Sequence, residues 1–591
     1  MKRVFLLAIA AMISTQLAAA DMPPATSDVQ FQWGVKIPMR DGVKLNATAY
    51  LPQGKSPAPC IFTLTPYISQ SYHDRGMYFA AHGLPFLTVD VRGRGNSDGK
   101  FRPMLQEAKD GHDIVEWLAK QPYCNGKISM WGGSYAGYDQ WATAKEMPPH
   151  LATIVPAAAA HPGVDFPMRN NLSYPYLVQW LLFTSGHTSQ ENIFGDGDFW
   201  EARNRRWYES GAPLEQLDTL VGISLPAFHE WLAHPHRDAY WDTYVPTQEQ
   251  YARLQIPILT ITGSYDGDQP GAMEFYQQHM KLGSAEAKAR HYLIIGPWDH
   301  AGTRTPKAEF GGLKFAEASL VDLPKLHLQW YAWTMQGGPK PEFLKDAVAY
   351  YVMGAEQWRY APSLEAVTSE SRMMYLGSHT NADDVYNAGS LQTQPVAESI
   401  ASDQYVYDPR DVSGAVVEAQ SAPDSLVDQR LVLAGHGKQL VYQTAPLEKD
   451  TEISGFFRLS AWIALDQPDT DFAATVYEIG ADGSSIVLTN DLLRARYRES
   501  MREPKLVTTR DPLRYDFTHF TFVSRMAKQG SRLRLVIAPV NSMYAEKNYN
   551  TGGVVASESV KAARTVTVKL MHDAQHPSIL YVPIGQPMPQ S

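Results

Sequence analysis

The sequence of 591 residues contains only two cysteines, Cys60 and Cys124. Two cysteines are too few for a disulfide-dense scaffold, and their separation matches no zinc-ligand spacing. Cys60 opens one strand-like run and Cys124 directly precedes another. In a parallel sheet both would lie at the N-terminal ends of neighbouring strands. A disulfide between them and two unpaired thiols both stay open at this point.

Long hydrophobic runs are absent beyond the N-terminus, which argues against a membrane-spanning protein. The N-terminus itself has the order of a secretory signal: Lys2 and Arg3, the apolar run 4–13, and Ala18-Ala19-Ala20 at a small-residue cleavage site. The apolar run is too short to be read as a membrane span. We therefore expect residues 1–20 to be a cleaved signal peptide and the mature protein to be periplasmic or secreted.

Basic residues are fewer than acidic ones. Lys and Arg together number 52 against 62 Asp and Glu, and the formal net charge is −10. A mildly acidic protein lacks the basic surface that attracts nucleic acid or an anionic membrane. We expect neither as a partner. The hydrophobic content of 44% is ample for buried cores in more than one domain.

Three kinds of sequence pattern follow one another along the chain. Residues 21–158 and 251–342 alternate strand-like and helix-like segments, which predicts an α/β domain with a mostly parallel sheet. Residues 159–250 contain no regular series of strand-like segments and are rich in Trp, Tyr and Phe, which predicts a helical cap. Residues 343–591, including the run Ala347–Met353, are short alternating segments separated by turns, which predicts an antiparallel β-sandwich.

The segment around Ser134 predicts a nucleophile. The apolar run Lys127–Trp131 ends in two glycines and Ser134, and a helix-compatible run begins at Tyr135. A strand, a sharp turn and a helix form a nucleophile elbow, which exposes its serine above the sheet. The literal pattern G-x-S-x-G occurs instead at Gly95–Gly99 around Ser97, but a loop-forming stretch follows it and cannot start a helix. Ser134 is therefore the preferred nucleophile.

Two later strands end in the residues that such a serine requires. One strand-like segment ends just before Asp266 and Asp268, and the next ends just before His300. A serine nucleophile needs a histidine base and an orienting acid, which α/β-hydrolases carry in this chain order. We expect Asp266 as the acid because it comes first, in a tight Asp-Gly turn. His300 is the expected base, since His291 begins its strand at the opposite end of the sheet.

The negative charge that forms on attack needs fixed hydrogen-bond donors. The backbone N–H of Tyr135, the residue after the nucleophile, is one expected donor. The second should come from the loop after the third strand, where Tyr67 stands. A phenol can donate, but from the residues alone Tyr67 as oxyanion donor and Tyr67 as a core residue both stay open.

Together these segments resemble the CocE/NonD (cocaine-esterase-like) hydrolases, which are related to X-Pro dipeptidyl-peptidases and α-amino-acid ester hydrolases. The resemblance covers nearly the whole mature chain, and its segments are Thr65–Tyr67, Asp90–Gly93, Gly133–Gly137, Gly263–Gly267, Ile295–His300, Leu440–Leu447, Asp469–Phe472 and Leu493–Ser500. The resemblance implies an α/β-hydrolase core with a helical cap and a C-terminal jelly roll. It also implies a Ser134–Asp266–His300 triad with the Tyr67 hydroxyl and the Tyr135 N–H as oxyanion hole.

One departure from the related enzymes concerns the residues after the triad acid. The amino-acid ester hydrolases resemble this chain there but carry acids at the second and third positions, which grip a substrate ammonium. This chain has Asp268 and Gln269 at those positions. Asp268 as an ammonium ligand and Asp268 as a solvated loop acid both stay open, and so does specificity for α-amino acyl groups.

The sequence thus predicts an exported serine hydrolase that cleaves small-molecule esters or amides through an acyl-serine intermediate, with no metal and no cofactor. One alternative is an amide-preferring acylase or X-Pro dipeptidyl-peptidase-like enzyme. Another is a carbohydrate-binding or adhesive protein with a vestigial hydrolase domain, against which the complete triad argues. The acyl group, the leaving group and self-association into a homo-oligomer are left open.

Overall fold

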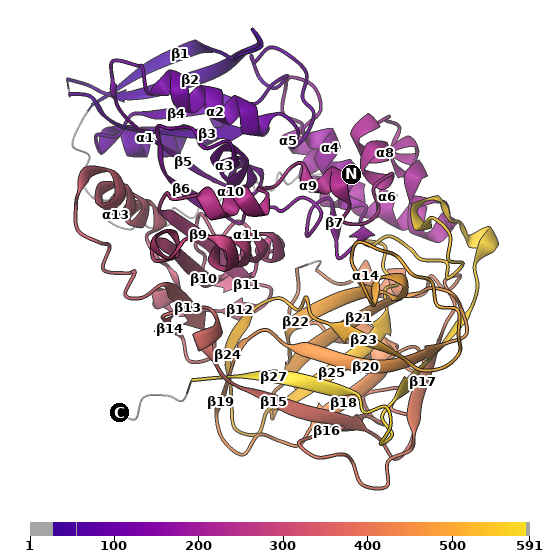
Figure 1. Cartoon of the computed structure of the whole chain (residues 1–591). Coiled ribbons are helices and arrows are strands. Elements are labelled where there is room, and N and C mark those ends of the chain that lie inside the picture. Colours follow the sequence, from indigo (N-terminus) through magenta and orange to yellow (C-terminus); the bar gives the residue numbers. More distant parts are fainter. Residues whose placement is uncertain (1–27, 55, 423, 587–591) are drawn as a thin grey trace, which may run out of the picture.

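The computed structural model describes residues 28–586 except residues 55 and 423. The predicted signal peptide, residues 1–20, lies outside the described residues. The chain forms an α/β domain, a helical cap and a C-terminal β domain, and the cap and the β domain lie on the same side of the α/β domain (Figure 1). Within the described part of the chain, no helix combines the length and the apolar character needed to cross a membrane.

The α/β domain is built on one sheet of ten strands. Its seven central strands are parallel, and antiparallel strands close both edges. In order across the sheet the strands are β1 (Val29–Pro38), β2 (Lys44–Pro52), β4 (Phe86–Asp90), β3 (Ala58–Thr65), β5 (Cys124–Gly133), β6 (Leu151–Ala157), β9 (Ile258–Tyr265), β10 (His291–Asp299), β13 (Val348–Val352) and β14 (Gln357–Ala361).

Helices cover both faces of this sheet, because its strands are apolar on both sides. Successive residues of β3 show this: Ile61 packs with one helical layer and Phe62 with the other, and both are fully buried. The first layer contains α1 (His73–Ala81) and α13 (Leu323–Gln336). The second contains α2 (Glu107–Leu118), α3 (Tyr135–Lys145) and α11 (Gln269–Leu282), with α12 (Ala285–Lys288) following α11.

The predicted insertion between β6 and β9 is the helical cap. Its large aromatic side chains are mostly buried in the core that it shares with the sheet, for example Trp207 and Trp241. The cap consists of a short hairpin, β7 (Met168–Arg169) and β8 (Leu172–Ser173), followed by α4 (Tyr176–Phe183), α5 (Glu191–Phe194), α6 (Gly197–Ser210), α7 (Leu217–Val221), α8 (Pro226–Leu232), α9 (Ala239–Asp242) and α10 (Gln248–Arg253).

The C-terminal domain is a β structure whose strands enclose a separate apolar core. All its strand pairs are antiparallel except β16 with β18. Its strands are β15 (Thr368–Gly377), β16 (Gly389–Gln392), β17 (Ser402–Tyr407), β18 (Leu440–Thr444), β19 (Thr451–Gly455), β20 (Arg458–Leu465), β21 (Asp471–Ile479), β22 (Ser485–Arg494), β23 (Leu513–Phe517), β24 (Val523–Ala527), β25 (Arg532–Pro539), β26 (Val566–Met571) and β27 (Ile579–Gly585). Short helices α14 (Gly414–Glu418) and α15 (Arg430–Ala434) connect two of them, and β11 (Glu309–Phe310) and β12 (Leu313–Lys314) form a small ribbon before α13.

The architecture confirms the predicted fold class, but one segment pairs in a different sheet from the one predicted. The run Ala347–Met353 was predicted to open the C-terminal sandwich. It contains β13, which pairs in parallel with β10 and extends the hydrolase sheet. Periodicity could not reveal this, because a short apolar run buried on both faces looks the same in either sheet. The strands β13 and β14, which follow the predicted boundary at residue 343, therefore complete the edge of the hydrolase sheet.

The two cysteines meet at the N-terminal ends of β3 and β5. Their Cα atoms are 5.5 Å apart and a disulfide joins them. It closes a loop with a sequence separation of 64 residues, which includes α1, β4 and α2. The bond therefore ties the two strands that lead to the Tyr67 loop and to Ser134.

Candidate active site

Ser134 occupies the sharp turn between β5 and α3. Its backbone has φ 62° and ψ −126°, a conformation that residues other than glycine rarely adopt. Three small residues make room for this turn. A Cβ on Gly132 would lie 2.6 Å from Cβ of Ala136, and one on Gly137 would lie 2.6 Å from the carbonyl oxygen of Ala157. Alanine at position 136 is thus tolerated because the residue opposite it is glycine.

Ser97, the serine of the literal motif, has a structural role. Its hydroxyl donates to the carbonyl oxygen of Asp90 at 2.8 Å and accepts from the N–H of Asn46 at 2.7 Å. The side chain is buried. These two bonds tie the loop after β4 to β2, and they leave Ser97 outside the cavity that contains Ser134.

The two predicted partners of Ser134 are brought together at neighbouring strand ends. Nδ1 of His300 lies 2.8 Å from Oδ1 of Asp266. Asp266 is buried, its Oδ2 accepts from the hydroxyl of Thr262 at 2.9 Å, and its Oδ1 also accepts from the N–H of Asp268 at 3.0 Å. The rival His291 is buried at the far end of β10, where it contacts Thr260 and another histidine.

Asp268 faces the same cavity and acts on His300 through its charge. Its Oδ2 lies 3.8 Å from Nδ1 of His300. Burial lowers the pKa of His300, but the charge of Asp268 and the hydrogen bond and charge of Asp266 outweigh burial, so the pKa is raised above its usual value. Burial raises the pKa of Asp268 itself, and His300 opposes that shift. Asp268 is therefore a partly buried acid that lines the cavity of Ser134.

Gln269, which replaces the second acid of the related enzymes, joins two domains. Its amide nitrogen donates to the carbonyl oxygens of Gly263 at 2.9 Å and Phe522 at 3.0 Å. Its amide oxygen accepts from the N–H of Phe522 at 2.6 Å. The Gln269 side chain is fully buried and does not line the cavity. Position 269 therefore supplies no second acid beside Asp268 in the cavity wall.

The two residues expected to donate to the oxyanion, Tyr135 and Tyr67, both line the cavity that contains Ser134. The Tyr135 N–H is the first of α3, where helical N–H groups have no internal partner. Tyr67 follows β3, and its ring lies 6.5 Å from that of Tyr135 at 74°. Burial raises the pKa of Tyr67, although hydrogen bonding to the side chains of Ser134 and Trp180 lowers it in part. Tyr67 therefore keeps its proton near neutral pH and remains a donor.

These side chains line one cavity of about 420 Å³. All three parts of the protein contribute to its wall, and most of the wall is aromatic or apolar. The α/β domain supplies Tyr67, Met104, Ser134, Tyr135, Ala160, Gly267, Asp268 and His300; the segment that enters the cap and α4 supply Asp165, Phe166, Arg169, Leu172, Ser173, Tyr174, Tyr176 and Trp180; and the C-terminal domain supplies Leu492, Tyr544 and Ala545. A second hollow of about 530 Å³ lies between residues 93–105 and the cap, and Ser134 is not part of it.

Several of these wall residues could not be identified from the sequence. Trp180 lies in the aromatic-rich segment 159–250, but its hydrogen bond with Tyr67 is visible only in the folded structure. Asp165 is buried, with its carboxylate oxygens accepting from the N–H groups of His161 at 2.7 Å and Gly271 at 2.6 Å. Leu492 lies more than 350 residues after Ser134 in the chain, so no local pattern connects them.

One group of side chains within the described residues has a geometry that could hold a metal ion. It consists of Asp383, Asp384 and His436, whose ligand atoms lie within 4.8 Å of one another. It belongs to the C-terminal domain. Oδ1 of Asp384 already accepts from the N–H groups of Tyr386 and Asn387, and Oδ2 lies 2.7 Å from Nδ1 of His436. Turn and side-chain contacts thus account for this group.

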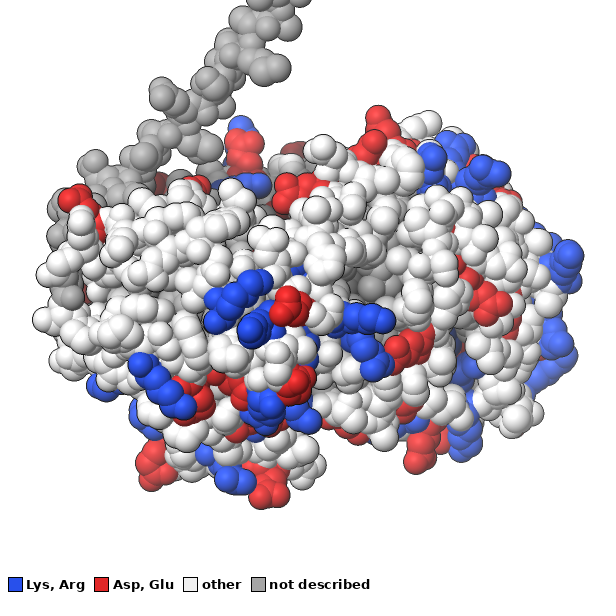
Figure 2. Space-filling model, turned by 90° about the horizontal axis from the view of Figure 1, so that it is seen from above, with Lys and Arg blue, Asp and Glu red and all other residues white. Residues whose placement is uncertain are grey.

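The surface carries charge of both signs. On the face shown in Figure 2, basic and acidic side chains are interspersed over a largely uncharged surface. Such a surface fits the mildly acidic composition of the chain.

Comparison with known proteins agrees with this architecture. Residues 41–302 match the family model of the X-Pro dipeptidyl-peptidase (S15 family), and residues 344–580 match that of the X-Pro dipeptidyl-peptidase C-terminal non-catalytic domain. The cocaine esterase of Rhodococcus sp. (strain MB1 Bresler) is 26% identical over 579 residues, which cover 93% of this chain and 98% of the esterase.

Solved structures show the same fold at lower sequence identity. An α-amino acid ester hydrolase superposes with a TM-score of 0.80 at 22% identity, covering 98% of this chain and 100% of the other. An aminopeptidase from the marine sediment archaeon Thaumarchaeota archaeon gives a TM-score of 0.80 at 21% identity, with 97% of this chain and 100% of that chain covered.

Proposed function

We propose that this chain, which belongs to the S15 family of hydrolases, is an exported serine hydrolase that cleaves ester or amide bonds through an acyl-Ser134 intermediate. The observation that carries the proposal is the pairing of His300 with Asp266 beside the strained Ser134 turn, in one aromatic cavity. A nucleophile, a base and an orienting acid at successive strand ends form the catalytic arrangement of α/β-hydrolases.

In the proposed reaction His300 acts as base and then as acid. Its Nδ1–H donates to Asp266, which leaves Nε2 free to accept the proton of Ser134 as the serine attacks the substrate carbonyl. The Tyr67 hydroxyl and the Tyr135 N–H stabilise the oxyanion. His300 returns the proton to the leaving group. In the second half-reaction His300 takes a proton from water as the water attacks the acyl carbon, and it returns that proton to the Ser134 oxygen as the carboxylic acid is released.

The cavity wall favours apolar or aromatic acyl groups. Phe166, Tyr176 and Trp180 provide flat apolar surface, and Asp268 provides a carboxylate. A substrate amine placed near Asp268 would gain a charge partner in a partly dry site. We therefore propose that esters with a free amine near the acyl carbon are turned over better than their blocked counterparts.

Amide cleavage is the alternative reading within the same mechanism. The S15 family model is described as X-Pro dipeptidyl-peptidase, and the fold is shared with an aminopeptidase. The cocaine esterase relative points instead to esters. Ester and amide substrates of the same acyl group, each with a free or a blocked α-amine, separate the two, since an amide-preferring enzyme has the higher kcat/KM for the amide.

A fluorophosphonate probe tests the nucleophile directly. Wild-type protein should become labelled and Ser134→Ala should not. Ser97→Ala serves as the matched control, because Ser97 lies outside the cavity and should leave labelling intact. Equal labelling of wild type and Ser134→Ala would contradict the proposal, and absence of labelling and turnover in the wild type would favour a vestigial hydrolase domain.

The proposed export is supported by the disulfide between Cys60 and Cys124, because such bonds persist mainly outside the reducing cytoplasm. The expected mature N-terminus is Asp21, after the three alanines. N-terminal sequencing of protein purified from the periplasm or the medium would check it. Full-length chain with Met1 retained in the cytoplasm would contradict export.

A further inference from the structure

We infer that Trp180 of the cap is a positioning residue that orients the hydroxyl of Tyr67 toward the oxyanion. The inference rests on the proposed function, since it assigns a cap residue to the same oxyanion hole. No sequence motif indicates this role, because Trp180 lies in the cap helix α4 and Tyr67 in the loop after β3.

The first observation is a hydrogen bond between the two side chains. Nε1 of Trp180 donates to the phenol oxygen of Tyr67 at 3.1 Å. An indole N–H can only donate, so the Tyr67 oxygen is the acceptor in this bond. The single proton of the phenol must therefore point to another partner. Tyr67 and Ser134 line the same cavity, the side chain of Ser134 lowers the pKa of Tyr67 in part, and the proposed oxyanion forms beside Ser134.

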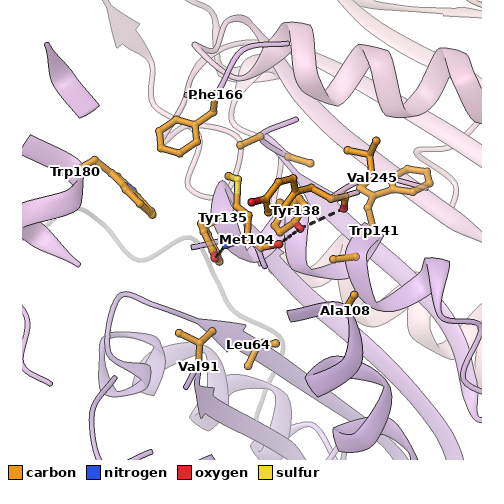
Figure 3. Packing of buried hydrophobic residues seen from close by; sticks show 14 of the residues in the cluster. Leu64, Val91, Met104, Ala108, Tyr135, Tyr138, Trp141, Phe166, Trp180 and Val245 are labelled. Atoms are coloured by element: carbon orange, nitrogen blue, oxygen red, sulfur yellow. Dashed lines mark hydrogen bonds between the residues drawn. The ribbon is translucent and has the colours of Figure 1, made fainter. Parts of the chain in front are cut away.

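The second observation is that the same indole packs against the other oxyanion residue. The rings of Trp180 and Tyr135 are stacked, with centroids 5.7 Å apart and planes at 20°. The Tyr135 hydroxyl is fixed at its far end by Glu107 and by the N–H of Met104. Figure 3 shows the Tyr135 ring next to Met104, with Trp180 and Phe166 on the cap side. One cap residue thus contacts both residues that supply oxyanion donors.

The third observation concerns what fixes Trp180 relative to Tyr67. Arg94 is fully buried and its guanidinium binds only carbonyl oxygens in the described contacts. Nε donates to Pro66, the residue before Tyr67, at 2.7 Å, and Nη2 donates to Phe183, the last residue of α4, at 3.3 Å. Arg94 therefore ties the Tyr67 loop to the C-terminal end of the Trp180 helix.

These contacts together make the geometry of the oxyanion hole depend on the position of the cap. When α4 is in place, the indole N–H occupies one lone pair of the Tyr67 oxygen and limits rotation of its hydroxyl. A preorganised donor stabilises the transition state more than one that must reorient during the reaction. Loss of the indole N–H should therefore lower kcat and leave KM nearly unchanged. Substitution of a residue that only forms the apolar wall would change KM instead.

Trp180→Phe tests this, because phenylalanine keeps an aromatic ring against Tyr135 and removes the N–H donor. We expect kcat to fall about tenfold for a small acetate ester, with KM changed less than about twofold. In a Tyr67→Phe background the same substitution should cause no further fall in kcat, because the hydroxyl that it orients is gone. Circular dichroism and the melting temperature should match wild type in every variant.

Trp231→Phe is the matched control. Trp231 lies beside Trp180, with ring centroids 6.2 Å apart, but it lines the neighbouring hollow rather than the cavity of Ser134. It should leave kcat within about twofold of wild type. An equal fall in kcat for Trp180→Phe in both Tyr67 backgrounds, or a change in KM alone, would overturn the inference. Failure of Ser134 labelling in the wild type would overturn the proposed function instead.

Discussion

Nδ1 of His300 lies 2.8 Å from Oδ1 of Asp266, and the other oxygen of this carboxylate is held by the hydroxyl of Thr262. Both oxygens of the acid are therefore occupied, and its orientation is fixed before any substrate arrives. In the proposed mechanism this bond places the proton of His300 on Nδ1 and leaves Nε2 unprotonated, so that Nε2 can accept the proton of Ser134.

Asp266→Asn should lower kcat by about 10⁴-fold and leave the fold intact, because an amide at this position favours the wrong tautomer of His300. Steady-state kinetics with p-nitrophenyl acetate would measure the loss, and circular dichroism would check the fold. A loss of less than about tenfold would mean that another carboxylate orients His300, and Asp268 is the nearest candidate.

Asp268→Asn should move the acidic limb of the pH profile of kcat/KM to lower pH. His300 must be unprotonated to act as base, so activity is lost as the pH falls through its pKa. The charge of Asp268 helps to raise that pKa above its usual value, and removing the charge lets burial lower the pKa. The profile should be measured with a substrate that has no amine. An unchanged limb would show that Asp268 is uncharged in the free enzyme.

The same variant also separates substrates. If Asp268 binds an ammonium group, Asp268→Asn should reduce kcat/KM for a free α-amino ester more than for its N-acetyl counterpart. Equal reduction for both substrates would remove Asp268 from amine recognition.

Replacement of Cys60 and Cys124 by alanine should lower the stability of the α/β domain by roughly 2–4 kcal/mol. The bond closes a loop with a separation of 64 residues, and its loss returns conformational freedom to the unfolded chain. Thermal unfolding with and without reductant would measure the effect. Wild type treated with reductant should approach the variant, while the variant should not respond to reductant.

Arg494→Met should destabilise the protein by about 3–5 kcal/mol. Arg494, Asp471 and Glu546 are all buried, and the guanidinium pairs with both acids at 2.8 Å. The substitution leaves two buried carboxylates without the cation that pairs with them. Arg430→Met is the control. The Arg430 side chain is about half exposed, so its ion pair with Asp428 should contribute less than about 1 kcal/mol to the free energy of unfolding. Similar melting temperatures for the two variants would contradict this account.

The placement of Ser134, Asp266 and His300 at one edge of the sheet could be predicted because each follows a strand whose end is recognisable in the sequence. Ser134 stands after two glycines, and Asp266 and His300 each follow an apolar run with a glycine. Parallel strands bring these ends to one edge of the sheet, so chain order alone indicates their proximity.

The cavity wall could not be predicted in the same way. Trp180 and Asp165 acquire their positions through the packing of the cap, and Tyr544 belongs to another domain. The assignment of Ala347–Met353 to the C-terminal sandwich was wrong for a related reason. The sequence of this run indicates only that both of its faces are buried. It does not indicate that the run pairs with β10, because that pairing depends on the assembled sheet.

The wall contributed by Leu492, Tyr544 and Ala545 has a consequence for how such enzymes diversify. These residues belong to a domain that carries no part of the proposed triad, so a substitution there changes the cavity wall without replacing a residue that is proposed to cleave the bond. Gene duplicates can therefore diverge in the acyl groups they accept through changes in that domain, while the reaction chemistry is inherited unchanged. Exchange of whole C-terminal domains between relatives is accordingly a route to transfer selectivity as a unit.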